Sequence, residues 1–151
     1  MDKWDARFME MAEVIAGWAS CYQKDRKIGA VIVKNKRIVT TGYNGAPRGR
    51  ANCSDLGYCS REAMNVPRGE RYELCRSVHA EANAITKVAK SANNCDGSTL
   101  YITAAPCIEC SKLIIQAGIK RVVYLDDYRS EEGLELLRRV GIECVKRAIE
   151  E

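Results

Sequence analysis

The sequence of 151 residues contains no internal repeat, no low-complexity run and no segment that resembles a linker. These absences exclude a repeat architecture, and they leave no point at which the chain would divide into separate domains. A chain of this length can bury a core without disulfide staples. We therefore expect a single domain that spans residues 1–151.

The sequence also lacks a long hydrophobic run near its first residues. Positions 1–18 hold six charged residues among apolar residues at helical spacing, a pattern that excludes a signal peptide and a membrane span there. We expect a cytoplasmic protein with no membrane partner. Because thiols stay reduced in that compartment, the eight cysteines indicate metal binding rather than disulfide bonds.

A strong excess of one charge is absent as well. The chain carries 24 lysines and arginines against 20 acidic residues, which gives a net charge of +4. This mild excess is spread along the chain and is too weak to indicate a stable nucleic-acid partner. It is compatible with a small phosphorylated substrate.

Histidine occurs only once, and its position is informative. It begins the tripeptide His-Ala-Glu at 79–81, and the pentapeptide Pro-Cys-Ile-Glu-Cys follows at 106–110. Zinc takes nitrogen and thiolate ligands tetrahedrally, and a catalytic zinc ion keeps one position open for water. Glu81 is placed to contact that water as a general base. The predicted ligands of a catalytic zinc ion are His79, Cys107 and Cys110.

Two structural interpretations compete with a catalytic site. A closed zinc ribbon also uses histidine and cysteine, but it has no use for Glu81 or for Pro106. An ordinary core histidine would leave the cysteine motif as a coincidence. One imidazole and two thiolates give a zinc site a formal charge of zero, which acidifies water less than an all-histidine site does. A general base is then needed, and Glu81 supplies it.

The hydrophobic pattern predicts alternating strands and helices. An amphipathic first helix is indicated by apolar residues at helical spacing, namely Trp4, Phe8, Met11, Ala12, Ile15 and Ala19. Two β-branched runs at 28–33 and 37–43, separated by 34–36, predict a hairpin. Further strands are predicted at 99–103, 121–125 and 143–146, and they alternate with helices at 80–89, 107–117 and 131–140. We expect an α/β fold in which a sheet carries helices on both faces.

This arrangement places the predicted metal ligands at helix starts. His79 and Cys107 each begin a helix, and Pro106 stands at a helix entry, where its missing N–H costs nothing. The partial positive charge of a helix N-terminus favours thiolate over thiol. Both cysteines of the pentapeptide should therefore be ready ligands.

The two motifs match a known signature. Zinc deaminases share H-x-E followed by P-C-x-x-C, with the glutamate as proton shuttle. Together with four further segments, the chain resembles the cytidine-deaminase superfamily and especially its deoxycytidylate (dCMP) deaminases, a group that includes the bacterial ComE operon protein 2. These segments are IGAVIV at 28–33, GYNGAPRG at 42–49, VHAEANAI at 78–85 and AGIKRVVY at 117–124. The resemblance implies a three-layer α/β/α fold with a mixed five-stranded sheet.

Neighbouring families differ at particular residues. Free-cytidine deaminases typically have cysteine where this chain has His79. The tRNA adenosine deaminases lack the loop at 44–49 and the Asn-Ala-Ile continuation at 83–85. Another cytosine nucleotide and tRNA adenosine stay open as alternative substrates, as does a non-catalytic, zinc-stabilised binding or assembly protein. The intact Glu81 argues against the last, because a protein without catalysis would be free to lose that carboxylate.

The resemblance implies zinc-dependent hydrolytic deamination of dCMP to dUMP and ammonia, which supplies dUMP for dTMP synthesis. Glu81 would accept a proton from the activated water, which attacks C4, and would then protonate N3 and, in a second transfer, the departing ammonia. The resemblance also implies a homo-oligomer, a hexamer or a dimer, that is activated by dCTP and inhibited by dTTP.

Substrate contacts are expected in and near the loop at 42–49. Asn44 would hydrogen-bond the sugar hydroxyl, although it could equally serve as a turn former before Gly45. The glycines at 42, 45 and 49 would keep the loop close to the ligand. Ala80 is a further predicted substrate contact. A phosphate prefers guanidinium groups, and the candidates are Arg26, Arg48 and Arg50.

Four cysteines upstream of the histidine suggest a second, structural zinc ion. The loop from 46 to 78 is longer than a compact domain usually leaves without function or a staple, and four thiolates would close a tetrahedral site. The resemblance supports this hypothesis, because some phage dCMP deaminases hold a second zinc ion. The alternative is that these residues are small buried hydrophobic side chains. They are Cys21, Cys53, Cys59 and Cys75.

Overall fold

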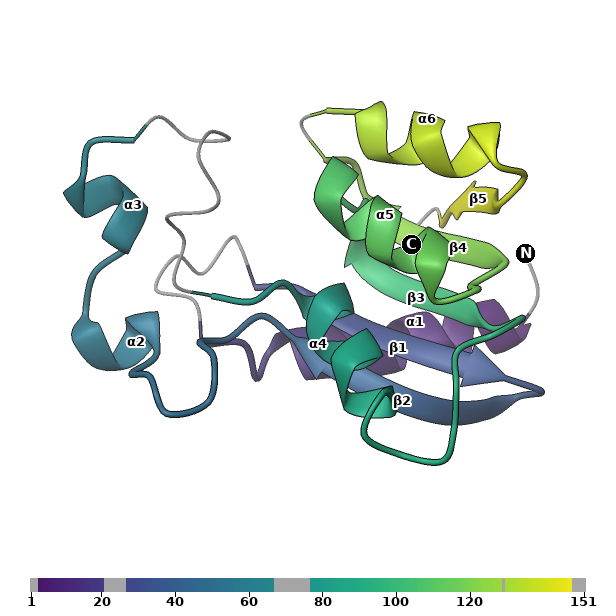
Figure 1. The fold of residues 1–151 in the computed structure, drawn as a ribbon, viewed down its shortest axis with the longest axis horizontal. Coiled ribbons are helices and arrows are strands. Elements are labelled where there is room, and N and C mark those ends of the chain that lie inside the picture. The colour runs from purple at the N-terminus through teal and green to yellow at the C-terminus, as the bar shows by residue number, and fades with distance from the viewer. Residues whose placement is uncertain (1–2, 21–26, 67–76, 129, 148–151) are drawn as a thin grey trace.

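The computed structural model describes residues 3–20, 27–66, 77–128 and 130–147 (Figure 1). Each predicted strand and each later predicted helix is present, with ends that differ by at most one residue. The elements are α1 (Lys3–Ala16), β1 (Gly29–Lys34), β2 (Arg37–Tyr43), α2 (Cys53–Leu56), α3 (Ser60–Ala63), α4 (Ala80–Val88), β3 (Thr99–Ala104), α5 (Ile108–Gln116), β4 (Arg121–Asp126), α6 (Glu132–Arg139) and β5 (Glu143–Lys146).

The five strands form one mixed sheet in the order β2-β1-β3-β4-β5. Strand β1 runs antiparallel to β2 and β3, whereas β3, β4 and β5 are parallel. The predicted hairpin joins β1 to β2 through Asn35 and Lys36, whose φ angles are 53° and 61°. Positive φ at both central residues is the geometry that matches the twist of a two-residue hairpin. In this strand order, β2 forms one edge of the sheet.

Helices cover both faces of the sheet, as the sequence predicts. Within β1, Ala30 and Ile32 pack on the face covered by α4, α5 and α6. Val31 and Val33 point the other way and pack against α1, which lies behind the sheet in Figure 1. Because successive strand residues face opposite sides, a strand buried on both faces is apolar at nearly every position. This explains the continuous apolar run of β1.

The buried face of α1 differs from the prediction at one residue. Met11 is 42% exposed, and Met9 is buried in its place at 1%. The buried stripe is set by the apolar side chains at 8, 12 and 15 together with Asp5. Met11 lies at the boundary of this stripe and is exposed, so its predicted place on the buried face is wrong.

An ion pair of a buried carboxylate fixes α1 to the sheet. Asp5 accepts two hydrogen bonds of 2.8 Å from the Arg121 guanidinium and one of 2.6 Å from the Tyr101 hydroxyl. The Arg121 contact holds the pKa of Asp5 below its usual value. A buried carboxylate needs such pairing, because burial without partners is costly. The pair ties α1 to both β3 and β4.

The segment 46–66 contains two helices that the sequence does not reveal. Helices α2 and α3 are four residues long and lie to one side of the sheet (Figure 1). Such short helices show no periodicity. The first is stabilised by a capping box, in which Asn52 caps the helix and the Asp55 carboxylate accepts the Asn52 backbone N–H at 3.2 Å.

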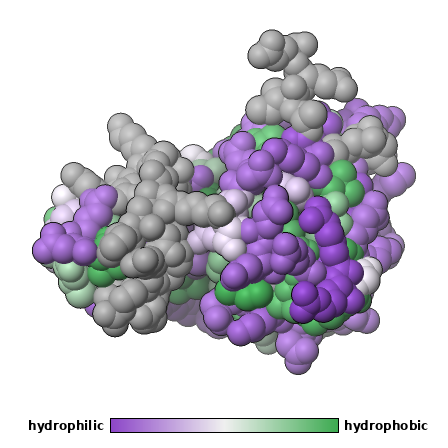
Figure 2. Space-filling model, turned by 90° about the horizontal axis from the view of Figure 1, so that it is seen from above, coloured by the Kyte–Doolittle hydropathy of each residue, from purple (hydrophilic) through white to green (hydrophobic). Residues whose placement is uncertain are grey.

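In the described part of the chain, no helix combines the length and the apolar character needed to span a membrane. Figure 2 shows that hydrophilic residues predominate over the side of the molecule where α6 lies. The exposed positions of α6 hold four charged residues. They are Glu132, Glu135, Arg138 and Arg139.

Candidate metal centre

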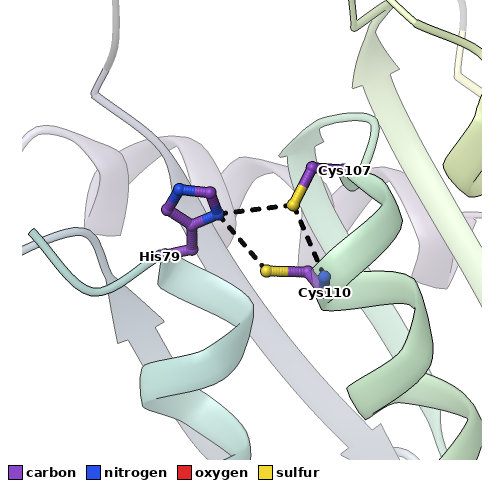
Figure 3. A group of neighbouring side chains, drawn as sticks. All are labelled: His79, Cys107 and Cys110. Atoms are coloured by element: carbon purple, nitrogen blue, oxygen red, sulfur yellow. Dashed lines mark hydrogen bonds between the residues drawn. The ribbon is translucent and has the colours of Figure 1, made fainter. Parts of the chain in front are cut away.

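The predicted metal ligands lie at the beginnings of two helices that face each other. His79 is the N-cap residue of α4, and Cys107 is the N-cap residue of α5. Cys110 belongs to the first turn of α5. Figure 3 shows the His79 ring extending from the start of α4 toward both sulfur atoms. The helix starts expected from the sequence are confirmed.

The distances between the ligand atoms suit a tetrahedral zinc ion. The Nδ1 atom of His79 lies 3.6 Å from the Cys107 sulfur and 3.3 Å from the Cys110 sulfur. With Zn–N of about 2.0 Å and Zn–S of about 2.3 Å, tetrahedral ligands lie about 3.5 Å apart. All three ligand atoms lie within 4.8 Å of one another. The group therefore fits a zinc ion with one open position.

The two thiols differ in how readily they lose their protons. The pKa of Cys107 is lowered to about 4, because the Cys110 side chain and the His79 imidazole hydrogen-bond to it. Its sulfur also accepts the backbone N–H of Cys110 at 3.4 Å. The pKa of Cys110 is raised by its hydrogen bond to Cys107 and by burial. Zinc binds cysteine as the thiolate, so metal binding would displace the proton that the raised pKa of Cys110 favours.

Glu81 lies beside this group in the first turn of α4. Its side chain is only 4% exposed, and burial raises the pKa of its carboxyl above the usual value. The carboxylate interacts with the charge of His79 and with the thiol of Cys110. General acid and base catalysis is most effective when the catalytic pKa lies near the working pH. The position and burial of Glu81 both suit a residue that accepts and returns a proton.

Asn44 is held by the protein backbone. It is 7% exposed, and its Oδ1 atom accepts the N–H of Ile28 at 2.8 Å. Its backbone carbonyl accepts the N–H of Ser20 at 3.1 Å. This side chain therefore anchors the segment that enters β1. A contact with a sugar hydroxyl stays a prediction.

The glycines of the loop at 42–49 have different physical roles. A Cβ atom on Gly42 would lie 2.2 Å from the carbonyl oxygen of Ala80 and 2.7 Å from the backbone nitrogen of Ala84. Gly42 therefore allows α4 to pack on β2, a role that differs from the proposed approach to a ligand. At Gly49 nothing lies within 4 Å of such a Cβ atom, and its φ is +83°. Glycine is favoured there because residues with a side chain rarely adopt positive φ. Ala80 is 0% exposed, and its substrate contact stays a prediction.

The predicted phosphate clamp is only partly described. Arg48 and Arg50 are exposed, and Arg26 lies outside the described residues. The sequence reasoning missed Arg61, which is 2% exposed on α3. The pKa of His79 is raised, chiefly by its hydrogen bond to Cys107, and the positive charge of Arg61 opposes this rise. No sequence signal marks Arg61, because the four-residue helix that carries it has no recognisable pattern.

Two of the four cysteines of the predicted structural zinc site can be placed. Cys53 is 3% exposed and Cys59 is 7% exposed. The Cys53 sulfur lies 4.0 Å from the Ser77 hydroxyl. Cys21 and Cys75 lie outside the described residues. Burial fits both a metal ligand and a small hydrophobic residue, so the second zinc ion stays a prediction.

Comparisons with known proteins agree with this geometry. The family model "Cytidine and deoxycytidylate deaminase zinc-binding region" matches residues 2–126. The deoxycytidylate deaminase of Schizosaccharomyces pombe is 38% identical over 143 residues, which cover 93% of this chain and 42% of that protein. The deoxycytidylate deaminase of Mycobacterium phage D29 is 43% identical over 126 residues, which cover 80% of this chain and 93% of that protein.

A solved structure adds the fold. The dCMP deaminase of cyanophage S-TIM5, in complex with dCMP and dUMP, superposes with a TM-score of 0.81 and 36% identity, covering 97% of this chain and 99% of that one. The match covers less than half of the S. pombe protein, 42%, and 43% of the deoxycytidylate deaminase of Saccharomyces cerevisiae. The chain belongs to the cytidine and deoxycytidylate deaminase family, and the predicted cytidine-deaminase-like fold is confirmed. The His-Cys-Cys group fits the zinc ion of that family.

Proposed function

We propose that this chain catalyses the hydrolytic deamination of dCMP to dUMP and ammonia. The observation that carries the proposal is the buried Glu81 carboxyl beside the group formed by His79, Cys107 and Cys110. The names of the relatives support the choice of substrate, because the phage D29 protein is a deoxycytidylate deaminase and the S-TIM5 structure holds dCMP and dUMP.

Zinc and Glu81 would have separate roles in the reaction. When bound, zinc supplies a water molecule of lowered pKa as the nucleophile for C4 of the cytosine ring. Glu81 accepts a proton from that water and delivers it to N3, and it then accepts the proton of the new C4 hydroxyl and delivers that one to the amino group that leaves. A C–O bond forms at C4 and the C4–N bond breaks, so dCMP and water give dUMP and ammonia. The burial of Glu81 keeps its carboxyl away from bulk water during these transfers.

Phosphate recognition should set the substrate class. We expect kcat/KM for dCMP to exceed that for deoxycytidine by about 10²-fold or more, because charge-assisted hydrogen bonds contribute about 1.5–3 kcal/mol each. Ammonia release from dCMP, deoxycytidine, cytidine and dCTP in parallel measures this. Equal efficiency on dCMP and deoxycytidine would contradict the role of the phosphate. Absence of release from every cytosine compound would contradict the proposed function itself.

The second zinc ion can be tested by counting metal. We expect two zinc ions per fully loaded chain, falling to one in Cys53→Ser, because closed thiolate sites lose affinity when a ligand is removed. Cys95→Ser is the matched control, since Cys95 is also buried but outside the predicted set. It should retain both ions. One zinc ion per chain in the wild-type protein would end the hypothesis.

The same proposal extends to the assembly and its regulation. A homo-oligomer, a hexamer or a dimer, and the effectors dCTP and dTTP are implied by the family resemblance alone. Light scattering of the purified chain with and without dCTP measures the assembly. Activity against dCMP concentration at fixed dTTP measures the regulation.

A further inference from the structure

The side-chain amide of Asn83, in the second turn of α4, joins two separate segments of the chain. Its Nδ2 atom donates to the carbonyl oxygen of Tyr43 at 2.8 Å and to that of Val78 at 3.3 Å. Val78 directly precedes the candidate metal ligand His79. Tyr43 directly precedes Asn44, the predicted substrate contact. Each carbonyl therefore belongs to the peptide group that leads into a candidate functional residue.

The two segments also bond to each other directly. Val78 donates its N–H to the carbonyl of Gly45 at 2.7 Å, and Gly45 donates its N–H to the carbonyl of Val78 at 3.2 Å. This isolated bridge holds the loop against the residue that enters α4. Asn83 bonds to the same carbonyl of Val78 and adds a link to Tyr43, the last residue of β2. The amide thereby completes a connection between β2, the loop and the start of α4.

One helical turn further on, a second side chain makes a comparable contact. Lys87 donates to the carbonyl of Thr41 at 2.8 Å. Because Asn83 and Lys87 are four residues apart, they lie on one face of α4. This face runs along β2, the edge strand of the sheet, and its side chains bond to the strand's carbonyls. Lys87 contacts the middle of the strand, whereas Asn83 contacts the end that leads into the loop.

We propose that Asn83 is a positioning residue, which sets the backbone of His79 relative to that of Asn44. The proposal rests on the function proposed above and adds a role for a residue outside the metal group. Small displacements of reacting groups can cost about 10²-fold in rate, whereas partly exposed hydrogen bonds contribute little to global stability. Loss of the amide should therefore affect the site far more than it affects folding.

The test compares Asn83→Ala and Asn83→Asp with Lys87→Met. The aspartate keeps the shape of asparagine but replaces both donated hydrogens with a carboxylate that repels the two carbonyls. Lys87→Met removes the neighbouring contact of the same face while retaining an unbranched side chain. We expect kcat/KM for dCMP to fall about 10–100-fold in both Asn83 variants and less than about threefold in Lys87→Met. The melting temperatures of Asn83→Ala and Lys87→Met should be similar.

A second readout uses no substrate. The rate at which a chelator removes zinc from the folded protein should rise about tenfold in both Asn83 variants and stay near the wild-type rate in Lys87→Met. Zinc release and kcat/KM that match those of Lys87→Met would overturn the proposal, and so would losses that merely follow the melting temperature. If the wild-type protein fails to deaminate dCMP, the proposed function is wrong. The zinc-release comparison then still decides whether Asn83 positions His79.

Discussion

Glu81→Gln is expected to retain zinc and to lower kcat for dCMP by about 10²–10⁴-fold, the usual contribution of general acid and base catalysis. Glutamine has nearly the same shape as glutamate, but its amide cannot accept the proton of the attacking water. The site can compensate poorly, because two thiolates cancel the charge of the zinc ion and weaken its effect on bound water. Zinc content by atomic emission and ammonia release on the same sample measure the two quantities separately.

The matched control for this change is Glu109→Gln. Glu109 lies between the two cysteines in sequence, but its side chain is 78% exposed and, among the described residues, its one ion pair is with Lys112 at 3.6 Å. Surface ion pairs of this kind contribute little, so turnover should stay within about twofold of the wild-type value. A Glu81→Gln protein with full zinc occupancy and turnover near that of Glu109→Gln would refute the role of Glu81.

The metal group could be predicted from the sequence because its members are fixed by local structure. Cys107 and Cys110 are three residues apart at a helix start, which places both sulfurs on the same side of α5. The strands could be predicted equally well, because β-branched runs bounded by turn residues are compatible with few other secondary structures. In each case, the information lies within a few consecutive residues.

The features that sequence reasoning missed depend on contacts between distant segments. Arg61 becomes notable because the fold buries its side chain and brings its charge near His79. Asn83 looks like an ordinary helical residue, and its role depends on carbonyls up to 40 positions away in sequence. Met11 satisfies the helical spacing of the core residues, but Met9 occupies the buried face. The periodicity shows that one side of the helix is buried. It does not determine whether a residue at the boundary of that side is buried or exposed.

The sequence motif suggests that Gly42 keeps the loop close to a ligand, but close packing between α4 and β2 explains this glycine. The α4 helix approaches β2 so closely that a methyl group on Gly42 would meet backbone atoms of Ala80 and Ala84 at 2.2 and 2.7 Å. Backbone atoms within a helix cannot rotate aside as a side chain can, so the whole helix must shift. The helix that shifts carries Glu81 in its first turn and has His79 as its N-cap.

We therefore expect Gly42→Ala to cost about 3 kcal/mol of unfolding free energy, in the upper range of overpacked cores. For a chain of this size, that corresponds to a fall in melting temperature of about 6–12 °C. Because the displaced helix carries the candidate base, kcat/KM for dCMP should fall by more than about tenfold in the fraction that remains folded. Thermal unfolding and ammonia release below the transition measure the two effects.

Gly17→Ala makes the same chemical change at an exposed position after α1, where a Cβ atom would lie 3.2 Å from the carbonyl of Val14. Its effect on unfolding should stay within about 0.5 kcal/mol. If Gly42→Ala unfolds and deaminates dCMP like Gly17→Ala, close packing of α4 on β2 is not what position 42 requires. The alternative, that Gly42 keeps the loop close to a ligand, would then be favoured. If Gly42→Ala melts far below Gly17→Ala and also loses activity, the position of α4 on the edge strand controls both the fold and the site.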